Sequence, residues 1–129
     1  MKKYLLIDDE AIFIFIQSEV IHLHNQSNEV IMYSTAEEAL YYLKELLEQG
    51  AALPDFILLD IRMPNMNGFE FLDELRKFEL HVFDKTKIYL LSSSIDERDI
   101  KKSQEYPFVK GFKGKPLSEE IINEINKAE

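Results

Sequence analysis

Four of the five short apolar runs in this 129-residue chain are followed within two residues by side chains that could do polar chemistry. These side chains are Asp8 and Asp9 after the first run, Asp60 after the third, Ser92 after the fourth and Lys115 after the fifth. Three carboxylates that met without a counter-charge would repel one another, and at least one would be forced to take up a proton. A bound cation relieves that repulsion, so these residue types predict a cation site wherever the fold brings them together.

The same residue types suit the transfer of a phosphoryl group. Mg²⁺ takes about six oxygen ligands, usually from one or two carboxylates, waters and a phosphate. The chain contains no EF-hand loop, which argues against a Ca²⁺ cage. A lysine adds a compact positive charge and a serine adds a hydroxyl donor. One carboxylate can then act as the nucleophile while the cation and the lysine neutralise the phosphoryl oxygens.

Short apolar runs that alternate with longer amphipathic stretches must position these side chains. The runs are apolar on both faces, as in the strands of a covered parallel sheet, and they span 4–7, 29–33, 55–59, 87–91 and 108–113. The stretches between them predict helices over 11–25, 35–49, 69–78 and 96–105, and a last helix that begins at Ser118. Five successive β-α units predict an α/β fold with an open, doubly wound parallel sheet. Ligands of such sheets bind beyond the carboxyl ends of the strands, where the polar side chains lie.

Length and composition narrow the class of protein. A chain of this length, 46% of it apolar, predicts one domain over 1–129 that buries a core of its own. The absence of Cys excludes zinc ribbons, thiol nucleophiles and disulfide scaffolds. The net charge of −9 disfavours a nucleic-acid partner, so we expect none. No apolar run is long enough for a membrane span and there is no room for a secretory leader, so we expect no membrane insertion and a cytoplasmic location.

Four segments together resemble the receiver domain of two-component response regulators. They are Leu5-Leu6-Ile7-Asp8-Asp9-Glu10, the stretch from Leu58 to Gly68, the serine triplet that begins at Ser92, and Lys115-Pro116. The pattern Asp-x-x-Met-Pro-x-Met-x-Gly over 60–68 is the most specific of them, and the resemblance extends from about Lys3 to Ala128. It implies a flavodoxin-like (βα)5 fold with a five-stranded sheet in the order 2-1-3-4-5. It also implies a single-domain receiver that works without an output module.

The resemblance assigns a role to each matching position. Asp60 is implied to be the phosphoacceptor. Mg²⁺ is implied to be bound directly by Asp9, Asp60 and the backbone carbonyl of Arg62, and by Asp8 through a water molecule. Ser92 and Lys115 are implied to sense the phosphoryl group, and Phe112 matches the aromatic switch position. The family commonly has Tyr or His there. Because Phe112 has no polar group, a switch at this position would act through apolar contacts alone. The alternative is that Phe112 is an ordinary core residue. The peptide bond between Lys115 and Pro116 is often cis in this family.

The implied function is that of a signalling switch and not of an enzyme with a diffusible substrate. A sensor histidine kinase or a histidine phosphotransfer domain would donate a phosphoryl group to Asp60. The surface formed by the fourth helix, fifth strand and fifth helix would then change its affinity for an unknown downstream protein.

The first helix could dock the phosphodonor. Helical spacing predicts a core-facing stripe made of Ile12, Ile16, Val20 and Leu23. The opposite side of the helix and its border would then carry the docking candidates Phe13, Ile14, Gln17 and Ile21. The alternative is that these are scattered exposed apolar residues, which are normal on a protein surface.

Two rival functions belong to other classes. A Mg²⁺-dependent aspartyl phosphatase of the haloacid-dehalogenase type needs Asp-x-Asp after its first strand and usually a cap insertion, whereas this chain has adjacent Asp8 and Asp9. A phosphorylation-independent adaptor with the shape of a receiver usually lacks an acidic or lysine position, and none is missing here. Turnover of a phosphate ester would favour the first, and failure to bind Mg²⁺ would favour the second.

Overall fold

A computed structural model describes residues 1–127 and contains a parallel sheet of five strands in the order β2-β1-β3-β4-β5. The strands are β1 (Lys3–Ile7), β2 (Glu29–Tyr33), β3 (Phe56–Asp60), β4 (Lys87–Ser92) and β5 (Val109–Gly114). This architecture confirms the predicted fold class and the predicted strand order. Each strand lies within two residues of the run that predicted it.

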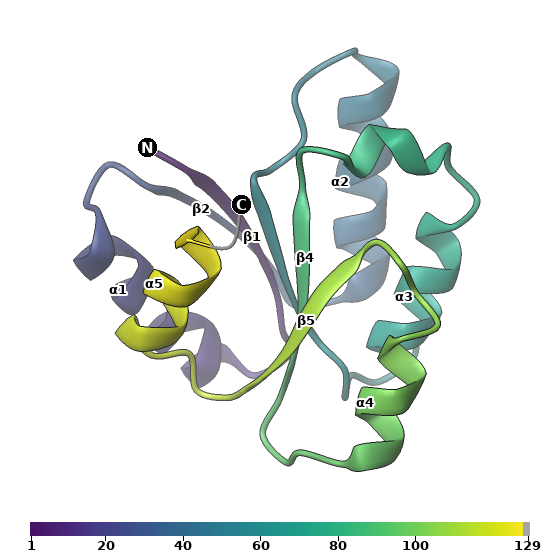
Figure 1. The fold of residues 1–129 in the computed structure, drawn as a ribbon. Coiled ribbons are helices and arrows are strands. Elements are labelled where there is room, and N and C mark those ends of the chain that lie inside the picture. Colours follow the sequence, from purple (N-terminus) through teal and green to yellow (C-terminus); the bar gives the residue numbers. More distant parts are fainter. Residues whose placement is uncertain (128–129) are drawn as a thin grey trace.

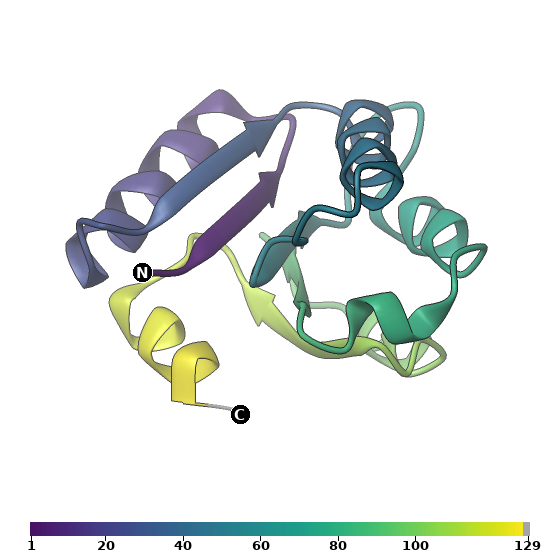
Figure 2. The ribbon, with the colours of Figure 1, turned by 90° about the horizontal axis from the view of Figure 1, so that it is seen from above.

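Helices cover both faces of the sheet (Figures 1 and 2). They are α1 (Ala11–His24), α2 (Ala36–Glu48), α3 (Gly68–Leu75), the 3-10 turn η1 (Leu80–Phe83), α4 (Glu97–Ser103) and α5 (Glu119–Lys127). Helices α1 and α5 pack on one face, and α2, α3 and α4 lie on the other. The predicted helix 69–78 ends three residues too late, because the chain leaves α3 after Leu75 and forms η1 before β4. No helix among the described residues is long and apolar enough to cross a membrane.

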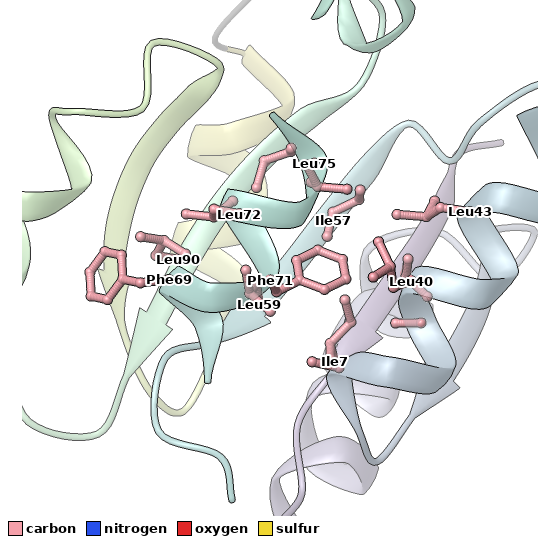
Figure 3. Packing of buried hydrophobic residues seen from close by; sticks show 14 of the residues in the cluster. Ile7, Leu40, Leu43, Ile57, Leu59, Phe69, Phe71, Leu72, Leu75 and Leu90 are labelled. Carbon is pink, nitrogen blue, oxygen red and sulfur yellow. The ribbon is translucent and has the colours of Figure 1, made fainter. Parts of the chain in front are cut away.

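The alternation of side chains along the central strands builds two cores. On β1, Leu5 and Ile7 point into the core under α2 and α3, and Tyr4 and Leu6 point into the core under α1 and α5. Figure 3 shows the first of these cores, in which Phe71 of α3 lies among strand and α2 side chains. Because both faces of β1 and β3 are buried, their sequences are apolar at nearly every position.

The predicted inner face of α1 is right only in part, since Val20 packs against the core under α1 and α5. Ile12 and Leu23, expected in the core, are 61% and 73% exposed, whereas Gln17 and Ile21 are 1% and 0% exposed. Residues 12–16 are apolar at every position, so periodicity alone does not fix the buried face, and a glutamine on the inner face breaks the remaining pattern. Gln17 and Ile21 are therefore not part of a docking surface.

Candidate functional site

The sheet register brings the predicted site residues to one edge. Ile7 pairs with Leu59, so Asp8, the next residue after β1, comes level with Asp60 at the end of β3. Ser92 at the end of β4 pairs with Gly114, and Lys115 follows directly. Possible ligand oxygens of Asp8, Asp9, Glu10 and Asp60 all lie within 4.8 Å of one another. Glu10 lay inside the acidic motif but was missing from the predicted metal ligands.

Lys115 is the cation among these carboxylates. Its side chain is 1% exposed, and its Nζ lies 2.9 Å from Asp8 Oδ2, 3.4 Å from Asp60 Oδ2 and 3.6 Å from Glu10 Oε1. Burial alone would lower the pKa of Lys115, but the hydrogen bond to Asp8 and the charges of Asp60, Asp8 and Glu10 outweigh it and raise the pKa above its ordinary value. The ring centre of Phe13 lies 4.2 Å from Nζ, so this docking candidate packs on the lysine of the site.

One carboxylate oxygen of Asp60 accepts a hydrogen bond, and the other has only an ion-pair contact among the described residues. Its Oδ1 accepts a hydrogen bond of 3.3 Å from the backbone N–H of Arg62. Its Oδ2 is buried and has no hydrogen-bond partner among the described residues, since Lys115 approaches only to ion-pair distance. Burial, followed by the charge of Asp8, raises the pKa of Asp60 to about 6, against the opposing effects of Lys115 and the Arg62 N–H.

The backbone around Asp60 explains two features of the specific motif. A Cβ on Gly68, the first residue of α3, would lie 2.9 Å from the backbone oxygen of Asp60 and from Cα of Ile61, so α3 can approach β3 this closely only with glycine. Asn67 caps α3 and exchanges hydrogen bonds with Glu70 in a capping box. The start of α3 is thereby fixed against the end of β3.

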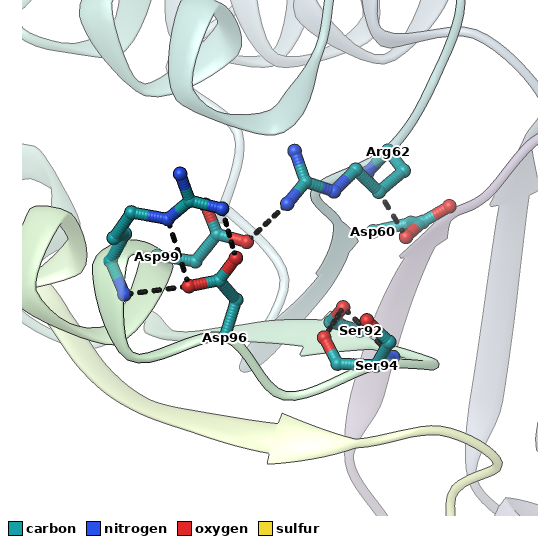
Figure 4. A network of polar contacts seen from close by, with 7 residues as sticks. Asp60, Arg62, Ser92, Ser94, Asp96 and Asp99 are labelled. Carbon is teal, nitrogen blue, oxygen red and sulfur yellow. Dashed lines mark hydrogen bonds and ion pairs between the residues drawn. The ribbon is translucent and has the colours of Figure 1, made fainter.

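Ser92 and Phe112 occupy different environments. The Ser92 hydroxyl donates a 2.7 Å hydrogen bond to the carbonyl of Ser94 and accepts one from the Ser94 N–H, so it is engaged within its own loop (Figure 4). The ring of Phe112 is half-buried against the core under α3 and also lines a groove between α4 and β5. This position is compatible with the switch and with the core role. The peptide bond between Lys115 and Pro116 is cis.

The side chain of Arg62 turns away from Asp60 and bonds to Asp99 on α4 (Figure 4). No sequence pattern indicated this pair, because 37 residues separate the partners. The role of the Arg62 backbone carbonyl as a metal ligand stays a prediction.

The donor set fits a hard divalent cation. Four carboxylates face a single lysine ammonium, which leaves the cluster with an excess of negative charge. All of the donors are oxygens, which Mg²⁺ prefers. Asp8, Asp9, Asp60 and the added Glu10 are the side chains that could hold it.

Comparison with known proteins agrees with the geometry. Residues 4–125 match the family described as the response regulator receiver domain. The chain belongs to this family. Receiver domains are phospho-accepting switches, so family membership also removes the haloacid-dehalogenase alternative.

Individual relatives have the same domain in different settings. The receiver is 36% identical over 75 residues to a protein-glutamate methylesterase/protein-glutamine glutaminase of Vibrio vulnificus, a match that covers 58% of this chain and 20% of that protein. It is 31% identical over 83 residues to the sensor histidine kinase CheAY of Helicobacter pylori, covering 64% of this chain and 10% of that protein. The chain thus matches only a fifth or less of the length of these curated relatives.

Solved structures match over nearly the full length. A two-component response regulator from Cytophaga hutchinsonii is 31% identical with a TM-score of 0.89, and the match covers 97% of this chain and 93% of that one. A response regulator receiver protein from Dyadobacter fermentans is 28% identical with a TM-score of 0.84, covering 97% of this chain and 94% of that one.

Proposed function

We propose that this receiver accepts a phosphoryl group on Asp60 from a histidine kinase or a histidine phosphotransfer domain, and then alters a surface that binds a downstream protein. The observation that carries the proposal is the state of Asp60. Its Oδ2 is buried, has no hydrogen-bond partner among residues 1–127, and faces Lys115 at 3.4 Å. A buried carboxylate oxygen that has an ion-pair contact but no hydrogen bond is costly in a protein that does not use it.

The reaction requires Asp60 in its ionised form. In the transfer, an Asp60 oxygen forms a bond to phosphorus, while the phosphorus–nitrogen bond of the donor histidine breaks and the imidazole keeps the electron pair. With its pKa raised to about 6, Asp60 is mostly ionised at neutral pH. Lys115, held between Asp8 and Asp60, offers its ammonium to the charge that builds up on the phosphoryl oxygens.

Mg²⁺ is the cofactor that this site would use. Asp8, Asp9 and Asp60 would hold it together with the backbone carbonyl of Arg62, and Glu10 lies close enough to join them. When bound, the cation neutralises charge on the phosphoryl oxygens.

The response to phosphorylation would start at Ser92 and Lys115. The Ser92 hydroxyl must leave the Ser94 carbonyl before it can bond a phosphoryl oxygen, so the loop between β4 and α4 has to rearrange. Phe112, which lines the groove beside α4, would repack with that loop. The outer surface of α4, β5 and α5 would then change and set the affinity for the downstream partner.

The test is phosphorylation by a small acyl phosphate with Mg²⁺, followed by intact mass. The wild type is expected to gain the mass of one phosphoryl group, and Asp60→Asn is expected to gain none. Asp84→Asn removes an exposed carboxylate outside the acidic cluster and serves as the matched control, which should react like the wild type. Chelation of Mg²⁺ should abolish the gain.

Two results would contradict the proposal. One is a wild type that gains no mass from either a small acyl phosphate or a phosphorylated histidine domain, which would favour the adaptor alternative. The other is an Asp60→Asn variant that is still modified, which would place the acceptor elsewhere. Because the curated relatives are longer than this chain, the prediction that the receiver works without an output domain needs its own test, the mass of the native protein.

A further inference from the structure

An ion pair joins the loop that follows Asp60 to helix α4. Arg62, two residues after Asp60, donates from Nη2 to Oδ2 of Asp99 at 2.5 Å (Figure 4). The Asp99 side chain is 13% exposed and that of Arg62 is 64% exposed, so the carboxylate is largely buried while the arginine remains accessible. This contact joins the segment directly after Asp60 to helix α4.

Helix α4 has little apolar surface to hold it in place. Its seven residues, Glu-Arg-Asp-Ile-Lys-Lys-Ser, include one apolar side chain, Ile100, which is only half-buried. Besides the Asp99 pair, Lys102 places its Nζ 4.8 Å from the ring centre of Phe69 on α3. The position of α4 therefore depends strongly on polar contacts, which are easier to exchange than a packed core.

Arg62 lies where its guanidinium could bind either Asp99 or a phosphoryl group on Asp60. Its backbone N–H donates to Asp60 Oδ1, so the side chain begins beside the acceptor carboxylate. The neighbouring carboxylate of α4, Asp96, is already engaged by two nitrogens of Arg98 and does not need Arg62. A guanidinium matches the geometry of a phosphoryl group better than an ammonium does, because two parallel N–H groups can bind two oxygens.

We infer that Arg62 is shared between Asp99 and the phosphoryl group of Asp60, an inference that rests on the proposed function. In the unphosphorylated receiver, Arg62 holds Asp99 and fixes α4. A phosphoryl group carries nearly twice the charge of a carboxylate and competes for the guanidinium. Arg62 then binds the phosphoryl group. Asp99 is a positioning residue that binds Arg62 until Asp60 is phosphorylated.

The exchange destabilises the position of α4. Once Arg62 leaves, Asp99 is a largely buried carboxylate without its counter-ion, which is unfavourable until water reaches it. Movement of α4 away from the β3–α3 loop hydrates Asp99. The groove between α4 and β5, which Phe112 lines, would change shape in the same step.

The experiment compares Asp99→Asn with the wild type in two measurements. The substitution keeps the size of the side chain and removes the charge that competes for Arg62. The lifetime of the phosphoryl group on Asp60 is expected to lengthen about threefold, the size of effect that a partly exposed arginine contact supports. Amide hydrogen exchange in α4 of the unphosphorylated variant is expected to accelerate by a similar factor, since the ion pair between Arg62 and α4 is gone.

Two further variants separate this exchange from a general effect on α4. In the double variant Arg62→Gln with Asp99→Asn, the gain in lifetime should disappear because no guanidinium remains, while the faster exchange of α4 should persist. Glu97→Gln removes an exposed carboxylate from the first turn of the same helix, one with no ion pair within 1–127, and should change neither measurement.

The outcomes distinguish this inference from the proposed function. If the wild type is phosphorylated and Asp99→Asn has the same phosphoryl lifetime, the sharing of Arg62 is wrong and the function stands. The sharing is equally wrong if the double variant keeps the longer lifetime. If Asp60 accepts no phosphoryl group in the wild type, both the function and the inference fail.

Discussion

At Asp60, burial opposes the charge that phosphorylation needs. The pKa raised to about 6 means that the folded protein holds a proton on this carboxyl group at pH values where the unfolded chain, with a pKa near 3.8, has lost it. The favourable contribution of that proton is complete below about pH 4 and is lost as the pH rises through about 6. Above that range, the buried ionised carboxylate lowers the free energy of unfolding. A cation or a phosphoryl donor that binds the carboxylate would offset this loss.

This cost predicts that Asp60→Asn stabilises the metal-free protein at neutral pH. A pKa shift of this size, shared among coupled groups and reduced by solvent screening, corresponds to about 1–2 kcal/mol of unfolding free energy. In urea unfolding with a chelator present, the advantage of Asp60→Asn over the wild type should grow from about pH 4 to about pH 6 and then level off. Asp84→Asn should show no such trend. A variant that is less stable than the wild type at every pH would contradict this account.

Single residues also mark the limit of what could be predicted about the site without coordinates. Asp8, Asp60 and Lys115 were predictable because strand ends of a parallel sheet meet at one edge, whatever the side chains in between. The contact of Phe13 with Lys115 and that of Arg62 with Asp99 were not predictable, because each depends on the direction of a long side chain. The position of Glu10 at the site could have been predicted, since Glu10 belongs to the same acidic motif as Asp8 and Asp9.

At the scale of elements, strands were easier to predict than the faces of helices. A strand buried on both sides is apolar at nearly every position, and β1 and β3 were recognisable for that reason. Helix α1 contains apolar residues all around its first turns, so several faces compete for the core. Gln17 lies on the buried face of α1, and its Oε1 has no hydrogen-bond partner among the described residues. The face of α1 that packs against the sheet is therefore not its most apolar face.

The face that α1 leaves exposed differs in composition from the predicted docking candidates. Ile12, Phe15 and Leu23 are all more than half exposed and lie along one side of the helix, where the exposed Glu19 stands between Phe15 and Leu23. Helix α1 begins directly after Glu10, so this stripe starts beside the acidic site. We propose that Ile12 and Phe15, at the end of α1 nearest the acidic site, pack against an apolar helix of the phosphodonor, which would bring its histidine to Asp60.

Phe15→Glu is therefore expected to slow phosphoryl transfer from the cognate histidine domain about tenfold or more, because a charge replaces a buried apolar contact in the complex. Phosphorylation by a small acyl phosphate should be unchanged, since the exposed Phe15 is not one of the residues that form the site. The matched control is Tyr41→Glu, which charges a similarly exposed aromatic on α2. Loss of both reactions, or equal slowing by Tyr41→Glu, would count against docking on α1.

At the scale of the whole molecule, the site joins parts of the chain that are remote in sequence. Lys115 reaches back 107 residues to Asp8, and the ends of β1, β3, β4 and β5 all contribute to the same edge. A cation held by Asp8, Asp9 and Asp60 would join the ends of β1 and β3. Its binding energy therefore adds to the stability of the whole fold and not to one loop, because the site does not exist in the unfolded chain.

Mg²⁺ is accordingly expected to raise the thermal unfolding temperature of the receiver relative to the same protein in chelator. A ligand at about one hundred times its dissociation constant contributes about 2.7 kcal/mol, which shifts the midpoint by several degrees in a domain of this size. Asp9→Asn should lose most of the shift, because it removes an exposed ligand without disturbing the core, whereas Asp84→Asn should keep it. A shift that persists in Asp9→Asn would mean that the cation binds elsewhere on the protein and that the excess negative charge around Lys115 does not form the metal site.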